Sequence, residues 1–156
     1  MNQTRRTFLK GSMATGAVAV AVGAGLLTPQ TVLAAWPKGA FEAKGVDKTM
    51  SALFGKASTT DSKDIKIKAP DIAENGAVVP VSVTAKQSGI ESISILASSN
   101  PSPLTSSYNL GANTEGYVST RIKVRKTSKV IAVVKAGGKL YTASKDVKVT
   151  IGGCGG

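Results

Sequence analysis

The sequence predicts an all-β domain built as a two-sheet antiparallel β-sandwich. Three observations support this fold class: short runs of β-branched or alternating residues follow residue 61, turn residues separate them about every 8–12 positions, and no strong helical pattern lies between them. A parallel βαβ sheet is therefore disfavoured. The 156 residues suffice for one domain, and because aromatic residues make up only 4 %, the predicted core is aliphatic.

Residues 1–34 predict a twin-arginine export signal that is removed from the mature chain. The pair Arg5-Arg6 in TRRTFLK is followed by a weakly apolar run, residues 11–27, and then by small residues that suit a cleavage before Ala35. A membrane anchor is the alternative, but about 17 residues rich in Gly and Ala fall below the ~20 needed to span a bilayer. We therefore expect a periplasmic protein with no membrane segment in its mature form.

Residues 35–60 are predicted to form an N-terminal helical segment, with the helix in FEAKGVDKTMSALFG (41–55). A core role for Met50 is favoured over a cofactor role, because no second metal-type ligand lies nearby in the sequence. The apolar positions that define one helical face are Val46, Met50, Leu53 and Phe54.

Residues 61–151 are predicted to form the sandwich, immunoglobulin-like in architecture but without the Cys…Trp…Cys pattern of antibody domains. Gly137-Gly138 predicts a two-residue hairpin turn. Pro80 predicts an edge strand or a bulge, because proline cannot donate to a strand ladder. The seven or eight expected strands, of which 105–110 is the weakest, are 64–68, 76–85, 90–97, 105–110, 116–126, 129–136, 139–144 and 146–151.

The chain is strongly basic, with a formal net charge of +11 that falls to +8 when the signal leaves with Arg5, Arg6 and Lys10. Two interpretations stay open: a solvated surface, or a positive field that attracts small oxyanions or an acidic partner protein. Nucleic acid is a poor candidate, because few aromatic residues interleave with the charges. In strand 116–126, the predicted inward residues are Ile122 and Val124, and the outward ones are Arg121, Lys123 and Arg125.

The chain ends in Gly-Gly-Cys-Gly-Gly, which holds its only cysteine, Cys154. In an oxidising compartment a lone cysteine either pairs with another molecule or carries a reactive thiol. The chain has no histidine, so a Cys-His dyad and a His-ligated metal are excluded, and we expect no catalytic or metal site. We expect the glycines to form a flexible arm that presents the thiol to other proteins: Gly152, Gly153, Gly155 and Gly156.

Several uses of this thiol stay open. The cysteine could be incidental, it could link two copies of the chain, or it could join an exported interaction module to a partner through a disulfide. A mobile thiol is also suited to carrying a covalently attached group from one active site to the next.

The carboxyl-terminal sequence VKVTIGGCGG (147–156) resembles the tail of the SoxY family, the sulfur-carrier subunits of the sulfur-oxidation (Sox) system. Further resemblance lies in IAENGAVVPVSV (72–83), NPSPLTSSYNL (100–110) and VIAVVKAGGKLYTASKDVKVTI (130–151). The resemblance implies a non-catalytic carrier that forms a heterodimer with SoxZ, with Cys154 as the covalent attachment site for thiosulfate-derived sulfur.

The same resemblance implies three enzymatic partners. The cytochrome complex SoxAX joins thiosulfate to Cys154, the dimanganese hydrolase SoxB releases sulfate, and SoxCD, where present, oxidises the remaining sulfur. The haems and manganese belong to these partners, so the resemblance implies no cofactor for this chain.

Overall fold

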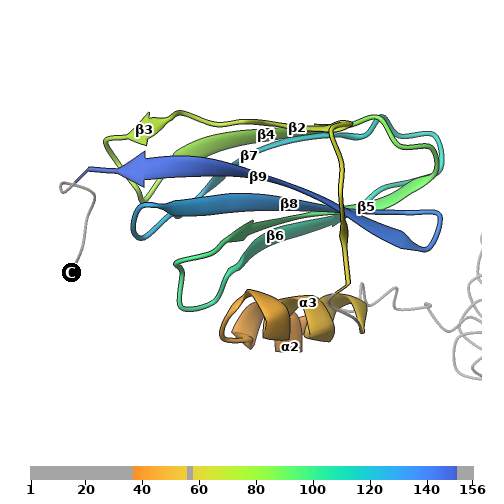
Figure 1. Ribbon diagram of the computed structural model, residues 1–156, viewed down its shortest axis with the longest axis horizontal. Coiled ribbons are helices and arrows are strands. Elements are labelled where there is room, and N and C mark those ends of the chain that lie inside the picture. Colours follow the sequence, from red (N-terminus) through yellow and green to blue (C-terminus); the bar gives the residue numbers. More distant parts are fainter. Residues whose placement is uncertain (1–36, 56–57, 151–156) are drawn as a thin grey trace, which may run out of the picture. The chain divides into compact units, whose positions relative to one another are not determined.

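The computed structural model of the chain describes residues 37–55 and 58–150, which form three layers (Figure 1). A three-stranded sheet in the order β2-β4-β7 faces a six-stranded sheet in the order β1-β9-β8-β5-β6, to which β3 adds by pairing with β9. Two helices lie on the outer face of the larger sheet. The elements are α2 (Lys38–Glu42), α3 (Val46–Phe54), β1 (Thr60–Asp61), β2 (Ile65–Lys68), β3 (Ile72–Ala73), β4 (Val79–Ala85), β5 (Ile90–Ala97), β6 (Leu104–Asn109), β7 (Tyr117–Ile122), β8 (Ser128–Ala136) and β9 (Lys139–Val149).

The predicted β-sandwich is confirmed, and its core is aliphatic as expected. Along β4 every second residue is buried between the sheets, while Pro80 and Thr84 face outward. Strand β5 occupies the predicted range Ile90–Ala97, and its Ile93 and Ile95 are fully buried in the same core. The two-residue strands β1 and β3, which pair with β9 in parallel, were not predicted because two residues carry no period.

The predicted N-terminal helix is present but is divided into two short helices. Helix α2 ends at Glu42 because Ala43 is extended, with a ψ of 139°, and α3 begins at Val46 after Gly45, whose φ of 85° a helix does not allow. Helix α3 ends at Gly55 in the left-handed conformation. Met50 is 4 % exposed and packs in a cluster with Leu96 and Val133 of the larger sheet. The predicted core role of Met50 is therefore confirmed.

The β8–β9 hairpin turns at Gly137-Gly138 as predicted. Both glycines have positive φ, 54° and 71°, as a type I′ turn requires. The predicted break between strands 139–144 and 146–151 is wrong, because β9 continues through Lys145 and pairs with β8 up to Val147. Lys145 stays within the strand, and its side chain donates a hydrogen bond to Ala69 O of a neighbouring segment.

The prediction of an edge strand or a bulge at Pro80 is wrong. Strand β4 is central, and Pro80 pairs in regular register with Arg121 of β7. The proline is tolerated because the pairing of β4 with β2 ends at Ser82. Since Lys86 N–H bonds to Asp64 on the β2 side, the even-numbered positions of β4 face β2, and position 80 lies beyond its end.

Strand β7 ends at Ile122, four residues before the predicted end. Val124 N–H donates to Gly76 O at 2.7 Å instead of continuing the ladder with β4. The predicted alternation nevertheless continues past the strand end. Ile122 and Val124 are buried, and Arg121, Lys123 and Arg125 are exposed.

Because Met50 anchors α3 to the larger sheet, Met50→Ala is expected to lower the free energy of unfolding by about 2–5 kcal/mol. Met50→Leu conserves volume and is expected to cost less than about 1.5 kcal/mol. Chemical denaturation of both variants and of the unchanged protein measures these differences. Equal stability of the alanine variant and the unchanged protein would show that the helical segment does not depend on this contact.

Candidate functional site

The predicted site lies outside the described residues, but its point of attachment lies within them. Thr150 is the last described residue, four positions before the cysteine. The structure therefore defines the end of the sandwich at which β9 finishes, at the arrowhead of β9 in Figure 1. The predicted residues outside the described ranges are Cys154, Gly152, Gly153, Gly155, Gly156, Arg5 and Arg6.

One side of the end of β9 is bonded to the chain that includes β3. Lys148 N–H donates to Asp71 O at 2.9 Å, and Thr150 N–H donates to Ala73 O at 3.1 Å. The parallel register places Ala73 beside Val149. The backbone is thus held by hydrogen bonds up to its last described residue.

The other side of β9 is bonded to a side chain. Val149 N–H donates to Thr127 Oγ1 at 3.0 Å. The Thr127 hydroxyl in turn donates to Val149 O at 3.5 Å. Strand β8 begins one residue later, at Ser128, and pairs with Val147. Thr127 therefore provides the hydrogen bonds that a longer β8 would have provided. We call residues 148–150 with their partners 71–73 and Thr127 the β9 root.

Close packing of Gly76 against two other segments supports the β9 root. A Cβ at this position would lie 2.4 Å from Val124 O and 2.8 Å from Val149 Cγ1, so only glycine fits without displacement. Gly76 O also accepts the hydrogen bond from Val124 N–H. The turn before β4, the segment after β7 and the end of β9 therefore meet at this residue.

Lys145 fixes the segment that leads into β3. Its ammonium donates to Ala69 O at 2.7 Å and lies 3.0 Å from Asp71 Oδ1. The Lys145 side chain is only partly exposed, while that of Asp71 is largely exposed. Since Asp71 O also accepts from Lys148 N–H, the lysine restrains one of the partners of the β9 root.

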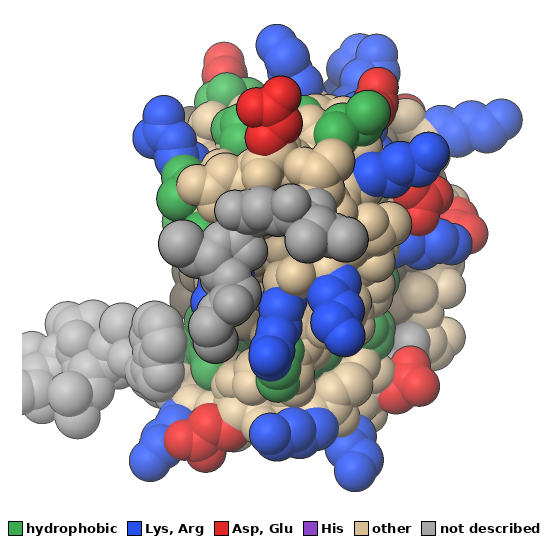
Figure 2. All heavy atoms as spheres, turned by 90° about the vertical axis from the view of Figure 1, so that its left-hand side faces the viewer, with side chains coloured by type: hydrophobic (Ala, Val, Ile, Leu, Met, Phe, Trp, Pro, Cys, Tyr) green, Lys and Arg blue, Asp and Glu red, His purple; other side chains and the backbone are tan. Residues whose placement is uncertain are grey.

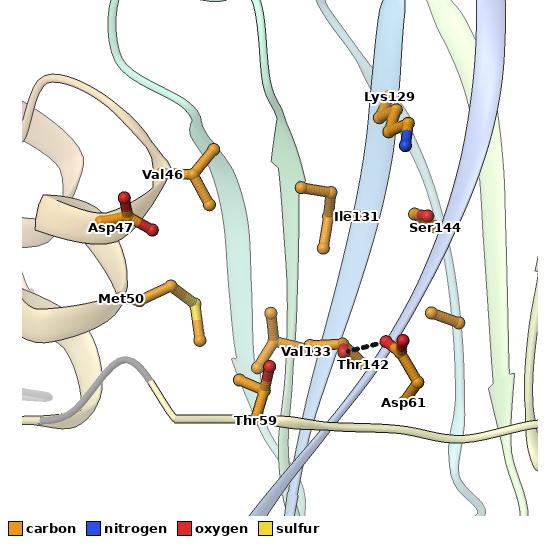
Figure 3. Close-up of a pocket in the computed structure, with 11 residues that line it drawn as sticks. Val46, Asp47, Met50, Thr59, Asp61, Lys129, Ile131, Val133, Thr142 and Ser144 are labelled. Carbon is orange, nitrogen blue, oxygen red and sulfur yellow. Dashed lines mark hydrogen bonds between the residues drawn. The ribbon is translucent and has the colours of Figure 1, made fainter.

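Two hollows lie between α3 and the larger sheet, and neither assembles a reactive group. The first, of about 240 Å³, places Val46 and Met50 opposite Ile131 and Val133 (Figure 3). Its polar side contains the bond from Thr142 Oγ1 to Asp61 Oδ1, 2.9 Å long. These contacts describe helix packing rather than a catalytic arrangement.

The second hollow, of about 450 Å³, lies beside Leu53 and Phe54. Its main polar feature is an ion pair in which Lys135 Nζ lies 2.6 Å from Glu91 Oε2. The hydrogen bond from Lys135, together with one from the Gly138 amide, lowers the pKa of Glu91. The arrangement stabilises a charged carboxylate, which gives no acid or base poised near neutral pH.

The described residues offer no other chemistry for the site. Residues 37–55 and 58–150 contain no group of three or more His, Cys, Asp or Glu that could hold a metal ion. Hydrogen bonds with Ser82 and Ser119 lower the pKa of Tyr117, but this residue begins β7, at the end away from Val124. In the part of the chain that the structure describes, no helix is long and apolar enough to span a bilayer.

A family model and a solved structure both relate this chain to the SoxY family. The family described as "Sulfur oxidation protein SoxY" matches residues 50–154, a span that ends at Cys154. A solved structure titled "Structure of the sulfur carrier protein SoxY from Chlorobium limicola f thiosulfatophilum" is 45 % identical, with a TM-score of 0.62, and the match covers 67 % of this chain and 96 % of that one. A superoxide reductase (neelaredoxin) from Ignicoccus hospitalis matches at 19 % identity and a TM-score of 0.49, over 55 % of this chain and 80 % of that one. No curated protein matches the sequence significantly.

The packing of Gly76 predicts that Gly76→Ala lowers the free energy of unfolding by about 1–3 kcal/mol, because the new methyl group overlaps Val124 O and Val149. Gly39→Ala is the matched control. A Cβ at Gly39 would have no neighbouring atom within 4 Å, and alanine has a higher helix propensity than glycine in α2. Denaturation curves compare the two variants. Unchanged stability of Gly76→Ala would contradict the close packing beneath the β9 root.

Proposed function

The chain belongs to the SoxY family of sulfur oxidation proteins, and from this membership we propose that it carries sulfur intermediates covalently on Cys154. Its role as a sulfur carrier in sulfur oxidation rests on the family match and on the 45 % identity to a SoxY sulfur carrier. The observation that supports Cys154 as the attachment site is that it is the only thiol in the chain and lies within the matched span.

The proposed loading reaction joins two sulfur atoms and releases two electrons. The Cys154 thiol and thiosulfate form a cysteine S-thiosulfonate: R–SH + S₂O₃²⁻ → R–S–S–SO₃⁻ + H⁺ + 2 e⁻. The electrons pass to a c-type cytochrome partner, SoxAX. Hydrolysis by SoxB then releases sulfate: R–S–S–SO₃⁻ + H₂O → R–S–SH + HSO₄⁻.

We assign the catalysis to these partners rather than to this chain. A nucleophilic cysteine needs a base and an orienting group in fixed geometry, and the chain contains no histidine. Its own contributions are the thiol and the surface that presents it. The remaining sulfane sulfur is available to SoxCD where that enzyme is present, and the working carrier is a heterodimer with SoxZ.

The length of the proposed arm fits a role in entering the active sites of other proteins. Cys154 lies four positions after Thr150, so at ~3.3–3.6 Å per residue the thiol would reach about 14 Å from the β9 root in an extended chain. Glycines at positions 152, 153, 155 and 156 keep the segment thin. A narrow channel admits such a segment but not the body of a sandwich.

The proposed location is the periplasm. The Arg5-Arg6 pair, the apolar run after it and the small residues before Ala35 support export by the twin-arginine route. That route moves folded, assembled cargo, which suits a carrier that leaves the cytoplasm together with its partner subunit.

Replacement of Cys154 by Ser is expected to abolish sulfur adducts and thiosulfate-dependent respiration without unfolding the domain, because the serine hydroxyl cannot form the sulfur–sulfur bond. Intact mass spectrometry of protein from thiosulfate-grown cells, with and without reductant, measures the adducts. The unchanged protein should show them only on the C-terminal peptide. A stable mixed disulfide with no turnover would instead support an exported interaction module, and an unmodified mass under all conditions would contradict the carrier role.

Replacing Gly152 and Gly153 with Val is expected to leave stability nearly unchanged and to slow reaction with the partner enzymes, since β-branched side chains widen and stiffen the segment. Thermal denaturation checks the first expectation, and adduct formation over time checks the second. Unchanged rates would show that a thin segment is not required.

A further inference from the structure

The short reach of Cys154 limits where a partner enzyme can bind. If the proposed function is right, each enzyme must bring its reacting atoms within about 14 Å of Thr150. An enzyme whose active site lies in a channel must therefore place the rim of that channel against the end of the sandwich that carries the β9 root. The side chains around the β9 root would then contact the rim of the partner's channel.

Apolar side chains are exposed at this end. The large hydrophobic residues that are more than half exposed in the described chain are Ile72, Val78 and Tyr117, and two of these three flank the root. Ile72, 58 % exposed, pairs with Lys148, and Val78, 51 % exposed, follows the turn at Gly76. Figure 2 shows hydrophobic side chains at the surface near the top of this end. Exposed apolar residues close to the point where the described chain ends suit the centre of a protein contact.

Basic side chains surround the root on a loop that is held in place. Lys123, Arg125 and Lys126 are exposed, and no ion pair among the described residues involves them. Asn100 fixes their backbone, since its amide donates to Lys123 O at 2.7 Å and accepts from Arg125 N–H at 2.9 Å. Ser99 Oγ adds a bond to Lys126 O.

The charge around the root is positive even after the nearby acids are counted. Segments 71–78, 121–127 and 145–150 together contain six basic and three acidic residues. Asp71 is engaged by Lys145, which leaves Glu74 and Asp146 as the other acids. Figure 2 shows lysine and arginine side chains projecting from this end on several sides.

We propose that Ile72 and Val78, with Lys123, Arg125 and Lys126, form a docking platform for the enzymes that load and unload Cys154. This inference rests on the proposed function. The partner surface is a channel rim that is apolar opposite Ile72 and Val78 and acidic opposite the three basic residues. The apolar pair holds the complex, and the basic loop accelerates encounter in a salt-dependent manner.

Charge reversal tests the basic part. The variant K123E/R125E/K126E is compared with K63E/K86E/K139E, which makes the same charge change at the opposite end of the sandwich, where β2 and β9 begin. Each carrier complex, reduced and purified, is mixed with thiosulfate and a periplasmic extract of thiosulfate-grown host cells, and adduct formation is followed by intact mass. At low salt we expect adduct formation to be about tenfold or more slower for the first variant and less than twofold slower for the second. The slowing of the first variant should become smaller at ~0.15 M salt, because salt screens the charges.

A second pair of variants tests the apolar part. I72S/V78S should slow loading at every salt concentration, whereas Tyr117→Ser, which removes the exposed hydrophobic residue at the far end, should not. Circular dichroism confirms that each variant is folded.

The outcomes separate this inference from the proposed function. The platform would be overturned if the two charge-reversal variants slowed loading equally, or if K123E/R125E/K126E and I72S/V78S both loaded at the rate of the unchanged protein. In either case an adduct on the unchanged protein would still uphold the carrier role. Loss of the partner subunit from the root variants, with normal loading of what remains, would assign this face to that subunit and also overturn the platform. Absence of any adduct on the unchanged protein would overturn both.

Discussion

The hydrogen bonding at the end of β9 is the constraint on which the rest of the structure depends. Ala73 O on one side accepts from Thr150 N–H, and Thr127 Oγ1 on the other accepts from Val149 N–H, the last two residues that the structure describes. Each such bond contributes only about 0.5–1.5 kcal/mol, but they act at consecutive residues. Ordered backbone therefore extends to Thr150, four residues before the thiol, so the position from which Cys154 can be presented is set by the sandwich.

Neighbouring strands of the larger sheet hold β9 by hydrogen bonds along both of its edges. Strand β9 pairs along β8 for most of its length, and the other edge is bonded by β1 at Tyr141 and by β3 at Lys148. The helices cover the outer face through Met50 and leave the end with the root uncovered. Among the described residues, no helix therefore covers the root.

Much of the fold was predictable because short-range patterns determine it. Alternation in β4 and β5 and two glycines at 137 and 138 specify strands and a turn within a few residues. Prediction failed where distant segments decide the outcome. The end of β2 at Lys68 made Pro80 acceptable in a central strand, and β3 exists only because β9 offers an edge. The division of the helix is by contrast a local effect of the backbone conformations of Ala43 and Gly45. Composition alone singles out Cys154 as a candidate, which stays a prediction, whereas the bond between Thr127 and Val149 joins residues 22 apart and leaves no local signal.

Amide hydrogen exchange resolved by residue tests the fixed root most directly. If β9 is the anchored base of a mobile segment, the amides of Lys148, Val149 and Thr150 exchange slowly because each donates a hydrogen bond, and those of residues 152–156 exchange at the rate of an unstructured peptide. Strong protection that continues through Cys154, or none at Thr150, would contradict the division between anchored strand and mobile thiol.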